Sequence, residues 1–159
     1  MNTRHYSLIM VLFVALLVPL MLPPAASLWA AEGKYAQDEQ TIAHLEQRAE
    51  QAKPRDQCFL YTELVAAMTD LAGRQLLEGD MDQASATFKK IQHYAELIHI
   101  GIENDPKRVK NAQMIMHRTT YRLNEYLHEV SSEDQVTLQA TLKQLNQVQD
   151  ELLIEVFKH

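Results

Sequence analysis

Histidine and methionine side chains in the second half of the chain are the residues best suited to bind a metal ion or haem. His117 and His128 are about three helical turns apart, so one helix face would carry both, separated by about 16 Å. One metal ion cannot span that distance, so a pair of histidine ligands would need one from another helix, such as His99. Met116 nearby would be a soft ligand. Helical bundles do hold haem and metal ions between facing helices. We expect instead a polar helix face with methionine filling the core and no cofactor, and we keep a small periplasmic metal- or haem-binding bundle as the alternative function.

A positive cluster of Lys107, Arg108 and Lys110 stands where a helix is predicted to begin. Positive charge at a helix N-terminus opposes the helix dipole, so the cluster requires compensation. An anion-binding site is one explanation. The other is ion pairing with carboxylates that the predicted bundle brings to the same end, such as Glu151 and Glu155. We expect ion pairing.

Cys58 is the only cysteine, so it cannot form a disulfide within the chain. It lies in an apolar stripe with Tyr61, Val65 and Met68. A free cysteine in such a stripe behaves as a small hydrophobic side chain. We therefore expect an inert core residue, the alternatives being a reactive thiol or a link between chains.

Sequence motifs for catalysis are missing from the chain. It has no glycine-rich phosphate loop, nucleophile elbow, zinc motif or Cys-x-x-Cys-His, and no Glu-x-x-His for a di-iron bundle site. The net charge of −6 argues against a nucleic-acid partner. We predict a protein that is not an enzyme and that has a structural role or binds a protein partner. The sequence leaves open the identity of that partner and the oligomeric state of this chain.

The first part of the chain has the pattern of a secretory signal. Arg4 and His5 precede an apolar run over residues 8–22, and small residues follow at 25–27. We predict a signal peptide over 1–27, with cleavage as late as residue 31, and export to the periplasm or outside the cell with no membrane attachment after cleavage. The alternative is an uncleaved N-terminal anchor, although the run is shorter than the ~20 residues that span a bilayer.

The remaining sequence is typical of long helices, because it has few glycines and prolines and many helix-forming residues. Residues 28–53 form a polar segment with a first helix, and residues 54–159 form a bundle of four helices. Its connections are short, so we predict an all-α, up-down antiparallel four-helix bundle with an additional N-terminal helix. The predicted helices cover about 34–52, 54–78, 81–103, 107–130 and 132–158.

Apolar residues at alternating spacings of three and four mark the faces that should be buried. The third helix carries them without a break: Met81, Ala84, Phe88, Ile91, Ala95, Ile98 and Ile102. The fourth helix is expected to bury residues as far as Tyr126, Leu127 and Val130. For the last helix, Ser132 and Gln135 fit a capping box. Its expected inner face is Leu138, Leu142, Leu145, Val148, Leu152 and Val156.

Two segments, 55–61 (RDQCFLY) and 141–148 (TLKQLNQV), resemble an uncharacterised family of exported bacterial helical-bundle proteins. The resemblance implies the same fold and compartment, and no activity, cofactor or site residues. One hairpin is also similar to a single tetratricopeptide unit, through Leu71, Ala72, Gly79, Ala84, Phe88 and Ile91. It departs from that motif at Gln75 and Glu96 and does not recur, whereas such arrays need about three repeats. We therefore interpret it as an ordinary helical hairpin.

Overall fold

The computed structural model describes residues 35–104, 107–130 and 135–158. The predicted signal peptide with its cleavage sites and the predicted cap at Ser132 lie outside the described residues. Within the described ranges the chain consists of helices and turns and has no strand, so the all-α prediction is confirmed. Residues 37–159 cluster into one unit by their contacts. None of the described helices is both long enough and apolar enough to cross a membrane.

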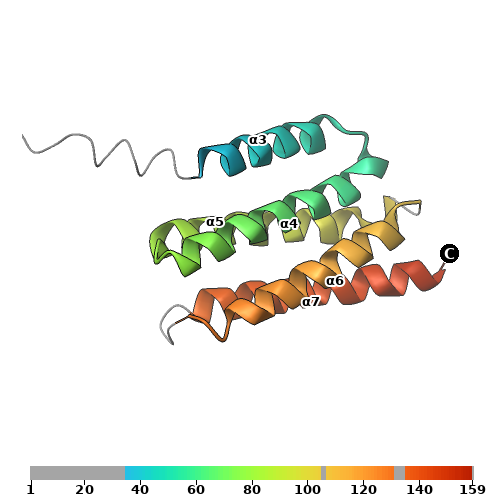
Figure 1. Ribbon diagram of the computed structural model, residues 1–159. Coiled ribbons are helices and arrows are strands. Elements are labelled where there is room, and N and C mark those ends of the chain that lie inside the picture. The colour runs from blue at the N-terminus through green and yellow to red at the C-terminus, as the bar shows by residue number, and fades with distance from the viewer. Residues whose placement is uncertain (1–34, 105–106, 131–134, 159) are drawn as a thin grey trace, which may run out of the picture. The chain divides into compact units, whose positions relative to one another are not determined.

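Five α-helices and one short 3-10 helix make up this part of the chain (Figure 1). They are α3 (Ala36–Gln51), α4 (Pro54–Leu77), α5 (Met81–Gly101), η1 (Ile102–Asn104), α6 (Val109–Tyr126) and α7 (Gln135–Lys158). Pro54 occupies the first turn of α4, where its missing N–H costs nothing. After α4, Gly79 adopts a left-handed backbone with φ 80°, which glycine accepts without a Cβ penalty.

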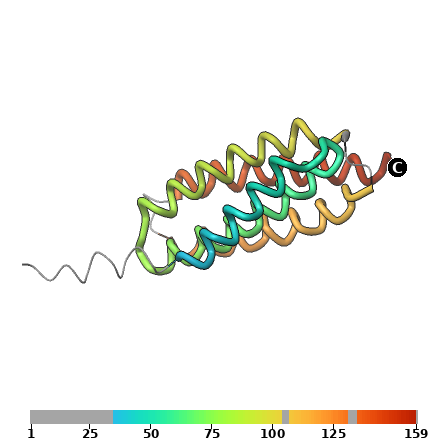
Figure 2. Tube along the Cα trace, turned by 90° about the horizontal axis from the view of Figure 1, so that it is seen from above, coloured from blue at the N-terminus to red at the C-terminus, as the bar shows by residue number. Residues whose placement is uncertain are grey.

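Helices α4 to α7 are neighbours in a closed order. α4 packs against α5 and α6, and α7 packs against the same two helices. Helix α3 contacts α4 and α5 through side chains: Asp38 pairs with Arg74 at 2.7 Å, and the Tyr94 hydroxyl lies 3.2 Å from a Glu46 carboxylate oxygen. The views in Figures 1 and 2 show these helices running lengthwise beside one another.

The core follows the predicted spacing most closely on α5. Every member of its stripe is buried except Met81, which is half-buried at the start of the helix. Phe88 and Ile91 lie in the middle of the stripe and are 2% and 0% exposed. Residues three and four apart lie on one side of a helix, and this side of α5 faces α4 and α7.

The predicted end of the fourth helix is wrong. Helix α6 ends at Tyr126 and not near Val130, and both Leu127 and Val130, which were expected to be buried, are half-buried. The reason is a competing set of hydrogen bonds. The side-chain amide nitrogen of Gln135, at the start of α7, donates to the backbone carbonyl of Leu127 at 3.3 Å and to that of Val130 at 3.4 Å. These carbonyls are therefore satisfied without another helical turn.

On α7 the inner face contains polar residues that the sequence pattern did not indicate. Thr141 and Glu155 are 0% and 5% exposed, whereas the predicted Leu142 and Val156 are only half-buried. Burial of these polar groups is tolerated because they have partners. The Thr141 hydroxyl accepts a hydrogen bond from Gln92 at 2.8 Å, and Glu155 pairs with Lys158 at 2.8 Å.

Polar side-chain contacts also connect each pair of packed helices. Each such hydrogen bond or ion pair forms at only one relative position of the two helices, so together these contacts fix the axial register of the bundle. They are Gln75–Thr87 between α4 and α5 (2.8 Å), Gln144 to the Gln92 carbonyl between α5 and α7 (2.9 Å), Thr120–Gln149 between α6 and α7 (2.5 Å), and Asp70–Arg122 between α4 and α6.

Candidate functional site

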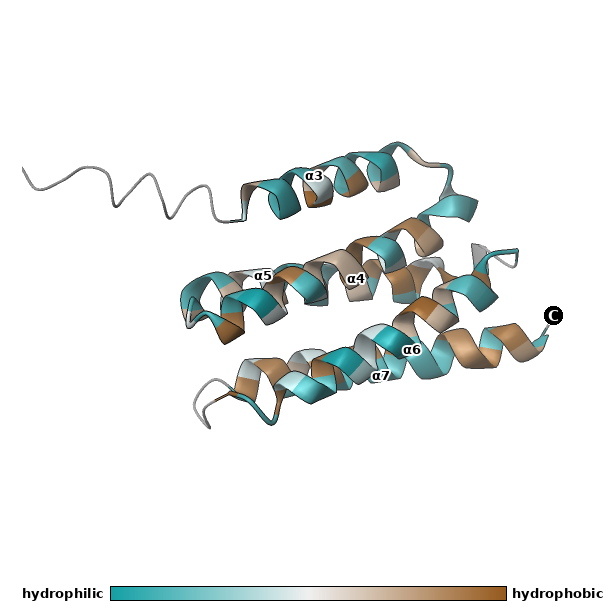
Figure 3. Cartoon of the chain, viewed as in Figure 1, coloured by the Kyte–Doolittle hydropathy of each residue, from teal (hydrophilic) through white to brown (hydrophobic). Residues whose placement is uncertain are grey.

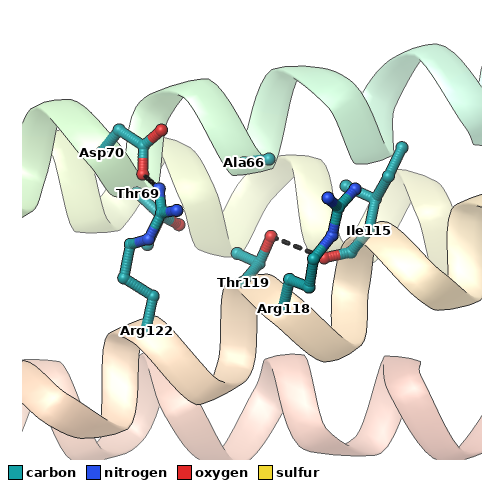
Figure 4. Close-up of a pocket in the computed structure, with 7 residues that line it drawn as sticks. All are labelled: Ala66, Thr69, Asp70, Ile115, Arg118, Thr119 and Arg122. Carbon is teal, nitrogen blue, oxygen red and sulfur yellow. Dashed lines mark hydrogen bonds and ion pairs between the residues drawn. The ribbon is translucent and has the colours of Figure 1, made fainter.

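A groove between α4 and α6 has two arginines on its wall (Figure 4). Its volume is about 200 Å³. Arg118 and Arg122 are one turn apart on α6, and their guanidinium groups stand at opposite ends of the groove. The full lining is Ala66, Thr69, Asp70, Ile115, Arg118, Thr119 and Arg122.

Several of the polar groups in this groove have partners within the protein. The Arg122 guanidinium donates to the Asp70 carboxylate, and this hydrogen bond and the Asp70 charge raise the pKa of Arg122. The hydroxyls of Thr69 and Thr119 donate to backbone carbonyls one turn earlier, each at 2.9 Å. The threonine oxygens therefore offer only acceptors to the groove. None of the residues that line the groove is a nucleophile placed beside a base.

Next to this groove, Tyr126 lies against the backbone of α4. A Cβ atom on Gly73 would be 2.2 Å from Cζ of Tyr126, so only glycine leaves room for the ring. Burial raises the pKa of the Tyr126 hydroxyl, and Asp70 adds to the rise. The sequence analysis expected Tyr126 to face the core but did not predict this contact, whose other signal was a glycine inside a long helix pattern.

The four candidate metal or haem ligands have different surroundings. His99 is exposed on α5, with Nδ1 2.6 Å from Glu151 of α7, and this hydrogen bond raises the pKa of His99. Met116 is 0% exposed in the core, while His117 lines a separate hollow of about 250 Å³ between α6 and α7. His128 is exposed in the turns that follow α6. In the part of the chain that the structure describes, no group of three or more His, Cys, Asp or Glu residues is arranged to hold a metal ion.

The positive cluster lies at the start of α6, as predicted, although Lys107 and Arg108 come just before the first helical residue. Arg108 is 3.7 Å from the Asp56 carboxylate, and its guanidinium lies 5.2 Å from the centre of the Phe59 ring. Both partners are in the first turns of α4, which packs against α6. Ion pairing and a cation–π contact are therefore present at Arg108, and Lys110 is exposed in the first turn of α6.

The acids that were expected to compensate this cluster have other contacts. Glu151 lies against His99, and the buried Glu155 pairs with Lys158. The sequence predicted that carboxylates would lie at the same end of the bundle as the cluster, but it did not show which helices would be neighbours there. Asp56, on α4, is a partner of Arg108 that the sequence analysis did not name.

Cys58 is confirmed as a core residue. It is 0% exposed, and it lies at a close approach of α4 to the end of α5, where a Cβ atom on Gly101 would be 3.6 Å from the Cys58 Cβ. Its sulfur is not part of a disulfide. Burial in the core limits the access of reagents to the thiol.

A second stripe runs along α7 on the side away from its core face. Its members are spaced four and three apart in alternation, like those of the α5 core stripe, yet all of them are exposed. Val136, Ile154 and Phe157 are 70%, 59% and 81% exposed. Figure 3 shows hydrophobic segments towards the C-terminal end of this helix. We call these residues the outer α7 stripe: Val136, Ala140, Lys143, Gln147, Asp150, Ile154 and Phe157.

The outer α7 stripe is the feature that sequence reasoning most clearly missed. Its spacing is readable in the sequence, but three polar residues in its centre make it look like an ordinary solvent-facing side. Comparisons with known proteins supply no further guide to function, because no protein-family model, no curated protein and no solved structure matches this chain.

Proposed function

We propose that this chain is a non-enzymatic, exported helical bundle that works by binding another protein chain. The observation that carries the proposal is the outer α7 stripe, with Ile154 and Phe157 exposed on a helix whose opposite side fills the core. Side chains of this size contribute about 1.5–3 kcal/mol each when fully buried, so leaving them in water on one helix face is costly without a partner.

The proposed architecture is the up-down antiparallel four-helix bundle, formed by α4 to α7, with α3 as the additional helix. Three residues separate α4 from α5, and four lie between η1 and α6. Connections this short favour antiparallel neighbours. The pairing of α4 with α5 and of α6 with α7 is consistent with that order.

The groove between α4 and α6 supports a binding role over an enzymatic one. Its carboxylate, Asp70, is held by Arg122, and both threonine hydroxyls donate to backbone carbonyls, so no nucleophile is activated by a base at the site. The metal- or haem-binding alternative gains no specific support, because His99 is engaged by Glu151 while Met116 is enclosed in the core.

Export is part of the proposal and rests on the sequence alone. The order of positive, apolar and small residues up to residue 27 is that of a secretory signal. The mass of the intact protein isolated from its host should be that of a chain starting between residues 28 and 32. A full-length mass recovered from membranes would contradict cleavage and favour the anchor.

Site-specific photo-crosslinking in the living host tests the binding role. A photoreactive amino acid replaces Ile154 in one strain and Leu77 in the other. Leu77 is a matched control for Ile154, because the two side chains are 61% and 59% exposed, respectively. Leu77 is the last residue of α4 and is not part of the outer α7 stripe. A discrete adduct with a protein at position 154 and none at position 77 is the expected result. Equal, diffuse labelling at both positions would overturn the proposal.

A further inference from the structure

From the arrangement of charges on the outer α7 stripe we infer that its partner is a second copy of this chain, packed antiparallel against the first. This inference rests on the proposed binding function and adds the identity of the partner. The stripe spans α7 from Val136 to Phe157, which is about 32 Å at 1.5 Å per residue.

The outer stripe has the form of a coiled-coil seam. Seven residues in an unbroken alternation of four and three lie on one side of the helix, and the structure leaves all of them exposed. On α5 the same spacing is buried by neighbouring helices. Among the residues that the structure describes, α7 packs against α5, η1 and α6, and α3 contacts α4 and α5, so no described helix covers the length of this side of α7. Only Ile154 also borders described neighbours, because it lines a hollow with His99 of α5 and Ile102 of η1.

The order of residue types along the stripe is self-complementary. Apolar residues occupy both ends, Gln147 stands at the centre, and Lys143 and Asp150 flank the centre with opposite charges. A two-fold axis near Gln147 turns the helix end for end. It brings Lys143 of one copy to Asp150 of the second copy, and Val136 to the region of Ile154 and Phe157. A two-fold interface must be complementary to itself in this way.

A parallel pairing fails the same test. It would set Lys143 against the Lys143 of the second copy and Asp150 against its own counterpart, and like charges across a coiled-coil seam select against that arrangement. Within one chain, Lys143 and Asp150 are two turns apart, about 10 Å, which is too far for an ion pair. The structure records no ion pair for either residue among those it describes.

The size of the stripe sets the strength of the association. Stable complexes bury about 1,200–2,000 Å² of total surface, and one pair of helices about 32 Å long falls at the lower end of that range. Polar residues at the centre reduce the affinity further and fix the register and direction. The dimer should therefore form in the micromolar range and exchange readily with the monomer.

Sedimentation equilibrium on the protein purified from its host, over about 1–500 μM, tests this inference. The wild type should pass from monomer to dimer across the series. Ile154→Lys should weaken the association at least tenfold, while the matched control Leu77→Lys should leave it unchanged. Both residues are more than half exposed, so neither change should alter the melting temperature at concentrations where the wild type is a monomer.

Charge exchange tests the antiparallel direction. Lys143→Glu places a negative charge opposite Asp150 of the second copy. Asp150→Lys places a positive charge opposite Lys143 of the second copy, so each single change should weaken the dimer. The chain with both changes restores opposite charges and should recover the wild-type association. A double variant weaker than either single variant would overturn the antiparallel arrangement.

Other outcomes separate this inference from the proposed function. A wild type that stays monomeric at every concentration, or a dimer that Ile154→Lys leaves intact, would refute self-association through the stripe. If crosslinking at position 154 then joins this chain to a different protein, the binding function stands and the second-copy inference fails. An adduct of twice the mass of the chain supports both.

Discussion

Replacement of Gly73 by alanine measures how closely α4 and α6 approach. In an open helix this change is favourable by about 0.5–1 kcal/mol, because alanine loses less backbone entropy. Here the new Cβ atom would lie 2.2 Å from Cζ, 2.3 Å from the hydroxyl oxygen and 2.4 Å from Cε2 of Tyr126. Carbon atoms pack at about 3.5–4.0 Å, so the ring must retreat by at least about 1 Å.

The cost of that retreat outweighs the helix propensity. Overpacking of a well-fitted site costs about 1–3 kcal/mol, and the ring of Tyr126 also gives up burial against α4. Gly73→Ala should therefore lower the free energy of unfolding of the wild type by about 0.5–2 kcal/mol after the propensity gain is subtracted. Tyr126 is the last residue of α6, so the ring can swing aside and keep the loss within this range.

A double-mutant cycle in urea separates the clash from other effects. In a Tyr126→Ala background the obstacle is gone, and Gly73→Ala should now raise the free energy of unfolding by about 0.5–1 kcal/mol. The two backgrounds should thus differ by about 1–3 kcal/mol and show opposite signs. If Gly73→Ala stabilised both backgrounds equally, the close approach of Tyr126 to α4 would be wrong.

Three further predictions follow from single side chains. The contact with Glu151 raises the pKa of His99 above 6.5, so its stabilisation is complete below that pH and is lost as the pH rises through the higher pKa. Urea titrations should show this loss in the wild type, and Glu151→Gln should remove the pH dependence from this window. Burial, then the charge of Glu46, raise the pKa of Tyr94 to about 12, so stability present below pH 10 should fall between pH 10 and about 12. Tyr94→Phe should reduce the slope of this fall, and the rest of it belongs to Tyr61 and Tyr126, whose pKa values are also raised. Cys58 is 0% exposed, so a thiol reagent should label it slowly in the native state and quickly in denaturant; rapid native labelling would contradict its place in the core.

The sequence was a good guide where burial depends on apolar spacing alone. The stripe on α5 is an unbroken series of apolar residues, and six of its seven positions are fully buried. On α7 the apolar spacing predicted that Leu142 and Val156 would be buried, because only apolar residues were counted as members of the inner face. The helix instead keeps the strict alternation and buries Thr141 and Glu155, whose partners are Gln92 and Lys158.

The candidate sites were harder to predict because they depend on contacts between distant parts of the chain. Asp70 and Arg122 are 52 residues apart in sequence, and they meet only because α4 and α6 are neighbours in a particular register. The same adjacency brings Asp56 to Arg108. Periodicity shows which side of a helix is buried, but it does not show which helix lies there or how far it is shifted along the axis.

Helix α7 gives the clearest argument for a partner outside the chain, since it carries two stripes of the same spacing. The polar residues of the inner stripe are buried and have partners within the bundle, whereas those of the outer stripe are exposed. On the inner stripe, Thr141 receives a hydrogen bond from Gln92 at 2.8 Å, so its hydroxyl is satisfied within the bundle. On the outer stripe, Lys143 and Asp150 are exposed, opposite in charge and symmetric about the centre, with Phe157 exposed beyond them. A merely solvated helix side needs neither the apolar ends nor the symmetric charges. Both features are explained together if this side of α7 is complementary to itself.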